Sequence, residues 1–560
     1  MFLNIRNRRN NASKAKQGSQ GRRSSALTKS TGSFSSTKSP LLSLDSTQHS
    51  VYLSPGEAQG RRRSGLTRSR GSFSSTRSLL SLDTTQHSVN LSPGEATRSL
   101  KQAHKRWVKQ LVKNPDLKVA VIGGGIYGCH FANAFDDACA EAAMALEMQI
   151  NAKLTIFEKD NTLFSQASGK NSFRIHKGFH YPRTGSTRRM CYNDHNKFIQ
   201  RYPSFFRTAF DEERSETIPA FSKVFAVAKD DKTKDYDAMR DLLKGAKYHE
   251  SGESLWDEID GELWSEEIRN SVEANKHREQ MEDLGFDPDL IDGAFLVQAE
   301  PILYADKPGL WFTEQFQQSS SIELEMGQLV DRDAIKAGGP RGDILVHGRP
   351  FDLVLNCTYN QAIPLQLSHH KAFYDLCISV IVAEKDLNDT SSPAVSFGIF
   401  DGPFPSLEPY DFAAEDLSSS GLEEYKGRNL FQIFDVELSS IAQSCDPSEA
   451  YMLMASWEEK KKHGCEDYQK VVHDIWEKCN KFFPRLESDF DLAGTWFALK
   501  TKVEDQNASR PLIVLPDKTV DEEGRFIQVF SSKLTSIFEA EEAVLDVVEN
   551  RDEIGLDILL

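Results

Sequence analysis

The clearest pattern of apolar and polar positions begins at residue 118. Residues 118–122 (KVAVI) form a short apolar run rich in β-branched side chains, which is typical of a buried strand. Residues 130–148 are rich in Ala, Leu, Met and Glu and contain no proline, which predicts a helix. Residues 153–157 (KLTIF) return to the strand pattern. Strand, helix and strand in this order predict a βαβ unit and therefore an α/β fold.

Later segments repeat both patterns. At 560 residues, the chain is long enough for two large domains. Further strands are predicted at 221–231, 351–361, 376–384 and 526–530, and strands around a turn at 393–410. Further helices are predicted at 231–246, 456–484 and 535–548.

Three glycines follow the first strand in the spacing G-x-G-x-x-G. Gly123 allows a tight turn, Gly125 lets the backbone approach a pyrophosphate, and Gly128 lets helix and strand pack closely. The helix start then offers free N–H groups to phosphate oxygens. Glu158, at the end of the second strand, is placed to accept hydrogen bonds from a ribose hydroxyl. The motif predicts a dinucleotide site, but it does not distinguish NAD from FAD.

Charge is unevenly distributed along the chain, whose formal net charge is −16. Residues 1–100 contain 16 Lys and Arg against 4 Asp and Glu, which leaves 51 against 79 in the remainder. An acidic body argues against nucleic-acid binding. No apolar run approaches the roughly 18 residues that a membrane-spanning helix needs. An anionic substrate would therefore need a local basic pocket.

The eight cysteines are scattered and form no C-x-x-C pair or zinc-finger spacing. This usage predicts reduced, mostly buried thiols, no metal site, and an intracellular protein, either cytoplasmic or organellar.

The front of the chain is repetitive. Residues 21–58 and 60–96 repeat one another and are dominated by Ser, Thr, Arg and Gly. Two such units cannot bury enough apolar surface to offset chain entropy. We expect residues 1–100 to form a disordered tail. A transit peptide is an open alternative, because the first 44 residues contain no acidic residue, but no convincing amphipathic helix accompanies it.

A polar segment follows the βαβ unit: residues 167–183 read ASGKNSFRIHKGFHYPR. If it is extended, residues 174, 176, 178 and 180 share one face. The segment resembles the D-amino-acid-oxidase-like superfamily of FAD-dependent oxidoreductases, in particular the 2-hydroxyglutarate and glycerol-3-phosphate dehydrogenase branch. That branch carries a segment like S-G-x-N-S-x-x-I-H-x-G-x-x-Y, matched here by Ser168, Gly169, Asn171, Ser172, Ile175, His176, Gly178 and Tyr181.

The end of the chain gives a second match. Residues 526–548 resemble the closing segment of the superfamily, in which a strand leads through a turn into a final helix. The resemblance implies that this helix start and Lys533 lie near the pyrimidine end of the flavin. The chain has Tyr359 and Ser532 where the superfamily usually has glycine.

The resemblance implies a Rossmann-like FAD-binding domain interleaved with an α+β substrate domain. The FAD-binding domain would comprise residues 116–220, 310–372 and 491–560, and the substrate domain residues 221–309 and 373–490. The implied cofactor-binding residues are Gly123, Gly125, Gly128, Glu158, Lys159, Ser168, Asn171, Ser172, Val330, Lys533, Leu534 and Thr535.

The resemblance also implies an activity. His176 or His180 would accept a proton while a CH–OH or CH–NH bond of a small anionic substrate loses hydride to the flavin. Arg174 or Arg183 would bind a carboxylate or phosphate. These polar residues could instead simply satisfy the cofactor and neighbouring loops. The electron acceptor is left open. Two alternatives remain: an NAD-dependent dehydrogenase, and a flavin-binding protein with a non-catalytic regulatory role.

Overall fold

The computed structural model describes residues 93–147, 149–179, 185–211, 216–219, 222–230, 272–275, 278–297, 300–338, 342–365, 371–385, 395–400, 402–412, 421–503, 512–531 and 533–550. All of them belong to the compact unit Arg77–Leu560. Helix α2 begins at Pro93, within the segment predicted as tail, and the two repeats lie almost wholly outside the described residues.

Six of the described strands form a mostly parallel sheet in the order β20–β21–β13–β1–β2–β9. Its central strands are apolar along their length because both faces of the sheet are covered. The predicted βαβ unit forms its centre, and the fold is α/β as expected. The strands are β1 (Lys118–Ile122), β2 (Lys153–Glu158), β9 (Ile322–Met326), β13 (Leu353–Asn356), β20 (Leu512–Pro516) and β21 (Phe526–Ser531).

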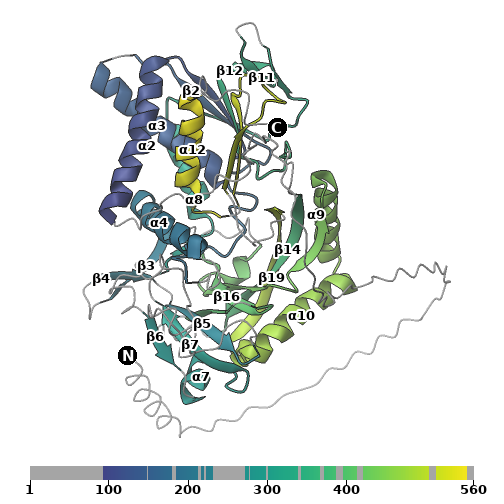
Figure 1. Cartoon of the computed structure of the whole chain (residues 1–560). Coiled ribbons are helices and arrows are strands. Elements are labelled where there is room, and N and C mark those ends of the chain that lie inside the picture. The colour runs from purple at the N-terminus through teal and green to yellow at the C-terminus, as the bar shows by residue number, and fades with distance from the viewer. Residues whose placement is uncertain are drawn as a thin grey trace, which may run out of the picture. The chain divides into compact units, whose positions relative to one another are not determined.

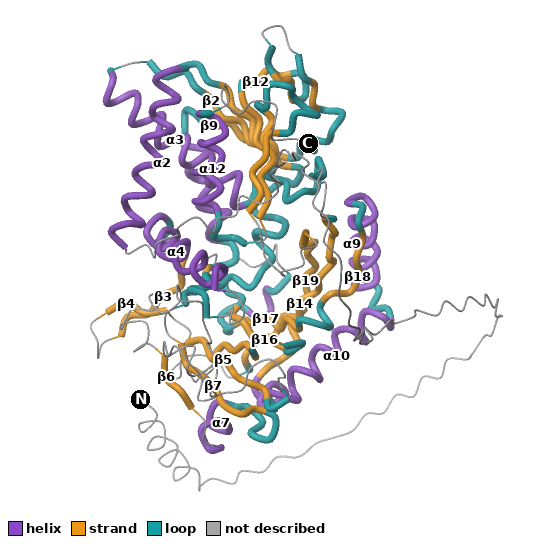
Figure 2. Tube along the Cα trace, in the orientation of Figure 1, coloured by secondary structure: helices purple, strands orange, loops and turns teal. Residues whose placement is uncertain are grey.

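Three helices lie together on one face of this sheet (Figures 1 and 2). They are α2 (Pro93–Lys113), α3 (Ile126–Leu146) and α12 (Ile537–Glu549). Helix α2 is anchored to α12 by Trp107, whose indole nitrogen donates to Glu541 at 3.0 Å, and by Arg106, which donates to Glu549. The helix therefore belongs to the core of this region. A small antiparallel sheet is formed by β10 (Ile335–Lys336), β11 (Ile344–Val346) and β12 (Arg349–Phe351), which share a second apolar cluster with Ala120, Ile122 and Phe157.

Nine of the described strands form a second, mainly antiparallel sheet, in which the long strands β14 and β19 pair along their whole length. The predicted strands at 221–231, 376–384 and 393–410 all lie in it. The strands are β5 (Ser222–Ala228), β6 (Val272–Asn275), β7 (Ile291–Val297), β14 (Ala372–Glu384), β15 (Val395–Ile399), β16 (Pro405–Pro409), β17 (Leu430–Asp435), β18 (Ser440–Ser444) and β19 (Phe490–Val503).

Two helices pack against this second sheet, α9 (Pro447–Lys462) and α10 (Glu466–Phe482) (Figure 1). The prediction of one helix over 456–484 is therefore wrong. The break falls at Gly464, whose φ of +59° a β-carbon would disfavour, and which follows the C-cap of α9. The helix predicted at 231–246 lies outside the described residues.

The remaining elements connect the two sheets or flank them. They are α4 (Gly185–Arg201), the short 3-10 helices Pro203–Phe205 and Glu423–Tyr425, β3 (Phe206–Asp211), β4 (Glu216–Pro219), α7 (Arg278–Leu284), β8 (Ile302–Leu303), α8 (Lys307–Gln318) and α11 (Arg485–Asp489). None of the helices in the described ranges is long and apolar enough to span a membrane.

Candidate active site

The glycine turn has the geometry that its spacing predicted. Gly123 has a φ of +103°, and a β-carbon there would lie 2.9 Å from the carbonyl oxygen of Cys357. A β-carbon at Gly128 would lie 2.1 Å from the carbonyl oxygen of Gly123, so the first turn of α3 packs directly on the end of β1. Any side chain at either position would force the turn apart.

Glu158 is fixed beside this turn. One carboxylate oxygen accepts from the backbone N–H of Gly124 at 2.7 Å, and the other accepts from the N–H of Asp160 at 2.9 Å. The side chain is buried and lines the cavity described below. These backbone bonds hold both oxygens in place, and a carboxylate oxygen can accept a further hydrogen bond from a ribose hydroxyl.

The loop after β2 closes over the start of α3. The hydroxyl oxygen of Ser168 accepts from the backbone N–H of Ile126 at 3.0 Å, so it takes one of the free N–H groups of the helix. Asn171 donates to the carbonyl oxygen of Ser168 at 2.7 Å and accepts from the N–H of Phe173 at 2.6 Å. These two side chains shape the loop, and both also line the cavity, as does Ser172.

The segment that follows is not one continuous strand. Among its described residues, 167–179, only Arg174 forms a β-bridge, with Ile302, while Phe173 and Gly178 have positive φ values of 52° and 110°. The condition for a shared face, an extended backbone, is therefore not met at Gly178. Arg174, Ile175 and His176 all line the cavity. His180 and Arg183, also predicted at this site, lie outside the described residues, as does Ser532.

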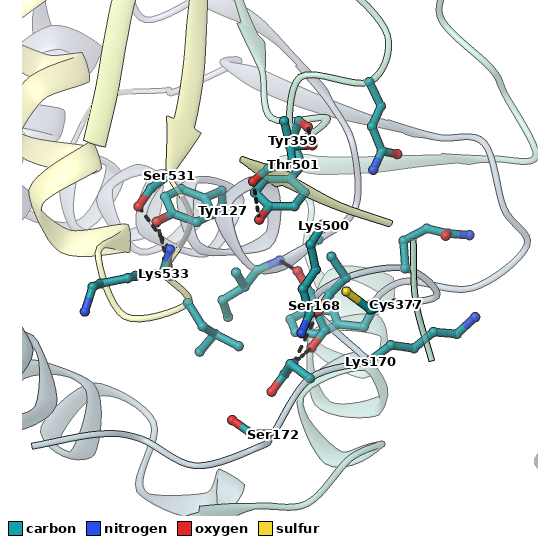
Figure 3. A pocket seen from close by; sticks show the side chains of 18 of the residues that line it. Tyr127, Ser168, Lys170, Ser172, Tyr359, Cys377, Lys500, Thr501, Ser531 and Lys533 are labelled. Carbon is teal, nitrogen blue, oxygen red and sulfur yellow. Dashed lines mark hydrogen bonds between the residues drawn. The ribbon is translucent and has the colours of Figure 1, made fainter. Parts of the chain in front are cut away.

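A single cavity of about 910 Å³ joins these parts (Figure 3). It is lined by Gly125, Glu158 and Val330, and also by Lys533, Leu534 and Thr535, which come just before α12. Lys159 also lines it. Of the predicted cofactor-binding residues, the cavity is thus lined by all except Gly128, which packs behind it. It lies within the size range of ligand and cofactor sites.

His176 sits in a buried network of charged groups. Its Nδ1 lies 3.3 Å from a carboxylate oxygen of Glu300, and its side chain is 19% exposed. Burial would raise the pKa of Glu300, but His176, Arg174 and the N–H of Lys177 outweigh burial and lower the pKa to about 2. Glu300 is therefore ionised and able to orient the imidazole or to stabilise its protonated form.

Arg174 is already engaged by the protein. It donates to Glu408 at 3.0 Å, to the carbonyl oxygen of Glu300 at 2.6 Å, and to the hydroxyl of Ser396. The second oxygen of Glu408 accepts from Lys223. Burial lowers the pKa of Lys223 to about 8. One carboxylate thus lies between two cations beneath the cavity.

The register of the second sheet determines which side chains face the cavity. On β14, Phe373, Asp375 and Cys377 alternate toward it. On β19, Trp496, Lys500 and Lys502 share that face, and Thr501 and Val503 also line the cavity. Asp375 pairs with Lys502 and accepts from Ser440. Figure 3 shows Lys500 reaching from β19 into the cavity beside Cys377. Its ammonium nitrogen lies 3.9 Å from the ring centroid of Phe434.

The face of the second sheet that lines the cavity is called its roof. Sequence reasoning did not identify the residues of this roof, nor the buried charged groups around His176 and Arg174. The residues concerned are Lys223, Glu300, Asp375, Glu408, Trp496, Lys500 and Lys502. Strand alternation was a readable signal for Lys500 and Lys502, but the choice of face depends on pairing between distant strands. Tyr359 and Asn360, at the predicted position of a missing glycine, both have positive φ, at 57° and 66°. Their backbone therefore follows the glycine-type path without glycine.

The described residues fit a dinucleotide such as FAD. The glycine turn leaves backbone rather than side chains facing the cavity at Gly123 and Gly125, and two helix starts, those of α3 and α12, border the cavity. Helix starts favour negative charge at both places, as a pyrophosphate and a reduced flavin would supply.

Comparison with known proteins finds relatives that are named FAD-dependent monooxygenases. No model of a protein family matches the chain. The FAD-dependent monooxygenase FPY4 of Fusarium mangiferae is 23% identical over 438 residues, which cover 77% of this chain and 91% of that protein. The FAD-dependent monooxygenase kojA of Aspergillus flavus is 35% identical over 88 residues, or 16% of this chain and 18% of that protein. The predicted resemblance to FAD-dependent oxidoreductases is confirmed.

The chain also matches a solved structure, that of L-α-glycerophosphate oxidase from Mycoplasma pneumoniae with FAD bound. It is 13% identical, has a TM-score of 0.46, and the match covers 78% of this chain and 94% of that one. Likeness at this level identifies no reaction.

Proposed function

We propose that the chain is an FAD-dependent oxidoreductase that oxidises a CH–NH or CH–OH bond of a small anionic substrate. The observation that carries this proposal is the cavity bordered by two helix starts, with His176 in its wall and Lys500 and Lys502 of the second sheet on its lining. FAD, when bound, supplies the acceptor for a hydride. The residues of the chain would accept the proton, position the groups involved and bind the substrate.

His176 is the proposed proton acceptor. It reaches the cavity, and Glu300 holds its Nδ1 side, so the opposite ring nitrogen is directed away from that carboxylate. As the substrate loses hydride, its hydroxyl or amino group must also lose a proton, and an adjacent imidazole can take it. Arg174 and Glu408 then act as positioning residues, because they fix the loop that carries the histidine.

Lys500 and Trp496 are the proposed binding site for the anionic group. Phe434 follows Ile433, which pairs with Val380 on β14. Trp496 on β19 pairs with Ser379, the residue before Val380, so Phe434 and Trp496 lie in the same part of the roof. The ammonium of Lys500 lies over Phe434, and the buried Trp496 nitrogen finds no hydrogen-bond partner among the described residues. An ammonium and an indole N–H in this position favour a carboxylate oxygen on a substrate with an apolar body.

The test is anaerobic reduction of the purified, FAD-loaded protein by a panel of hydroxy acids and amino acids. We expect at least one anionic substrate to bleach the flavin absorbance, and Lys500→Met to slow bleaching at least tenfold at low substrate concentration. Lys460→Met is the matched control, because Lys460 also lies over an aromatic ring, that of Trp457 at 4.5 Å, but outside the cavity. A colourless protein that binds no FAD would support the NAD-dependent alternative. A flavin that no substrate bleaches would support the regulatory one.

A second candidate reaction is oxygen insertion. It is favoured by the Fusarium relative, which is named a monooxygenase and matches this chain over 91% of its own length. Turnover under isotopically labelled dioxygen distinguishes the two reactions. An oxidase or dehydrogenase leaves the label out of the organic product, whereas a monooxygenase incorporates one labelled atom.

A further inference from the structure

A thiol and a primary amine meet in the wall of the cavity, close to the start of α12. The side-chain nitrogen of Lys533 donates to the sulfur of Cys191 at a distance of 2.9 Å. Cys191 is 2% exposed and Lys533 is 7% exposed, and both line the cavity. The two residues come from different elements, since Cys191 lies on α4 and Lys533 precedes α12. A bond between them would join segments that are far apart in the sequence.

The environment of Cys191 differs from that of the other thiols in the cavity wall. Cys377 has a carboxylate as its partner, with its sulfur 3.6 Å from Asp375, and Cys357 is buried against the glycine turn. Burial raises the pKa of the Cys191 thiol, while the neighbouring Lys533 acts against that rise. Thiols react with peroxide as thiolates, so we expect Cys191 to react slowly and only under sustained exposure.

We propose that peroxide converts Cys191 and Lys533 into a covalent sulfur–nitrogen cross-link. In the first step, hydrogen peroxide oxidises the thiol to a sulfenic acid: the O–O bond breaks, an S–O bond forms, and one water leaves. In the second step, Lys533, after losing its extra proton to solvent, attacks the sulfur with its nitrogen lone pair. The N–S bond forms, the S–O bond breaks, and the departing hydroxide takes a proton from nitrogen as a second water. The thiol loses two electrons, and peroxide gains them.

This cross-link would act as a regulatory brake on the site. It removes the positive charge of Lys533 beside the start of α12, where a reduced flavin would carry negative charge. This consequence, and the local supply of peroxide when dioxygen is the electron acceptor, rest on the proposed function. The cross-linking chemistry itself does not, because added peroxide can drive it.

The experiment treats the FAD-loaded protein with hydrogen peroxide, blocks the remaining thiols, digests with trypsin and identifies peptides by mass spectrometry. We expect a cross-linked pair containing Cys191 and Lys533 whose mass is the sum of both peptides minus two hydrogen atoms. Cleavage after Lys533 should disappear, and dithiothreitol should restore both peptides. The exposed Cys445 and Cys465 are replaced by serine in all samples to avoid disulfides between molecules.

Three variants define the site. Cys191→Ser and Lys533→Arg should abolish the cross-link, whereas Cys377→Ser should leave its yield unchanged. Because Lys533→Arg could fail to bind FAD, Cys191→Ser provides the decisive comparison. Recovery of Cys191 as a sulfinic acid with Lys533 unmodified would overturn the proposal, and a cross-linked pair heavier by one oxygen atom would overturn the direct sulfur–nitrogen bond. The readout needs no turnover, so absence of any oxidisable substrate would contradict the proposed function without affecting this result.

Discussion

Two histidines of this protein, His130 and His176, each contact a glutamate, yet their surroundings differ. His130 on α3 lies 3.1 Å from Glu541 and 2.7 Å from the hydroxyl of Tyr202, and it is 2% exposed. The other oxygen of Glu541 accepts from Trp107, so this network is closed by protein groups among the helices. His176 contacts Glu300 in a similar way but also faces the cavity. The same pair of residue types therefore lies among packed helices in one region and lines a cavity in the other.

The largest expected difference between the two histidines is catalytic. Replacing His176 by alanine should slow anaerobic flavin reduction by about 100-fold or more, because a positioned acid–base group contributes about that much. In the matched control, His130→Ala, the protein that folds should reduce its flavin as fast as the unmodified protein does. Both rates are measured by stopped-flow absorbance at saturating substrate. A His176→Ala variant that keeps its flavin and its full reduction rate would remove the catalytic assignment.

The second difference concerns stability. Glu541→Ala should lower the free energy of unfolding by about 3 kcal/mol, because it leaves a buried histidine and the Trp107 N–H without their acceptor. Glu541→Gln keeps one acceptor oxygen and should cost less. Thermal unfolding of both variants, with the flavin retained, gives the comparison. Equal melting temperatures for Glu541→Ala and the unmodified protein would mean that this network does not anchor α2 and α12.

The third prediction concerns the stability at acid pH that Glu300, the partner of His176, contributes. Glu300 has its pKa lowered to about 2, so its contribution to stability is present above the unfolded-state pKa and is lost as the pH falls toward 2. Glu300→Gln removes this dependence. Its melting temperature should fall less steeply than that of the unmodified protein between about pH 5 and pH 3, where the unfolded-state carboxyl titrates. Parallel curves would show that Glu300 is not held ionised by His176 and Arg174.

The glycine turn and the strands around it were predictable because their signals are local. The run KVAVI, the three glycines and Glu158 lie within one βαβ unit, and the steric demands of that turn are met by residues near in sequence. The final strand and helix were likewise readable from their apolar spacing. In these segments, local backbone preference and tertiary packing agree.

The roof of the cavity was not predictable, because it is assembled from distant strands. Lys500 faces the cavity only because β19 pairs with β14 in a particular register, and a shift of one residue would turn it to the other face. Lys223 and Glu408 are 185 positions apart, and nothing in either segment indicates the other. Tyr359 illustrates a different limit. The sequence showed that glycine is missing there, but not that tyrosine would take the positive φ, with its ring stacked on Phe530 and its hydroxyl on β19.

The smallest expected effect concerns Asp194 on α4, behind the cavity wall that contains Cys191 and Lys533. Burial raises the pKa of Asp194 well above its usual value, Glu539 adds to this rise, and Lys197 and Lys533 oppose it. Because the folded pKa is the higher one, folding takes up a proton, and the stability from this group is lost as the pH rises above the unfolded-state pKa. Asp194→Asn should therefore match the unmodified protein near pH 3 and exceed its stability by about 1 kcal/mol at neutral pH, as charge burial is avoided. Urea unfolding at both pH values measures the difference. If the variant is less stable at neutral pH, Asp194 is ionised there and paired with Lys197 and Lys533. This region would then maintain buried charge, as the region of His176 does.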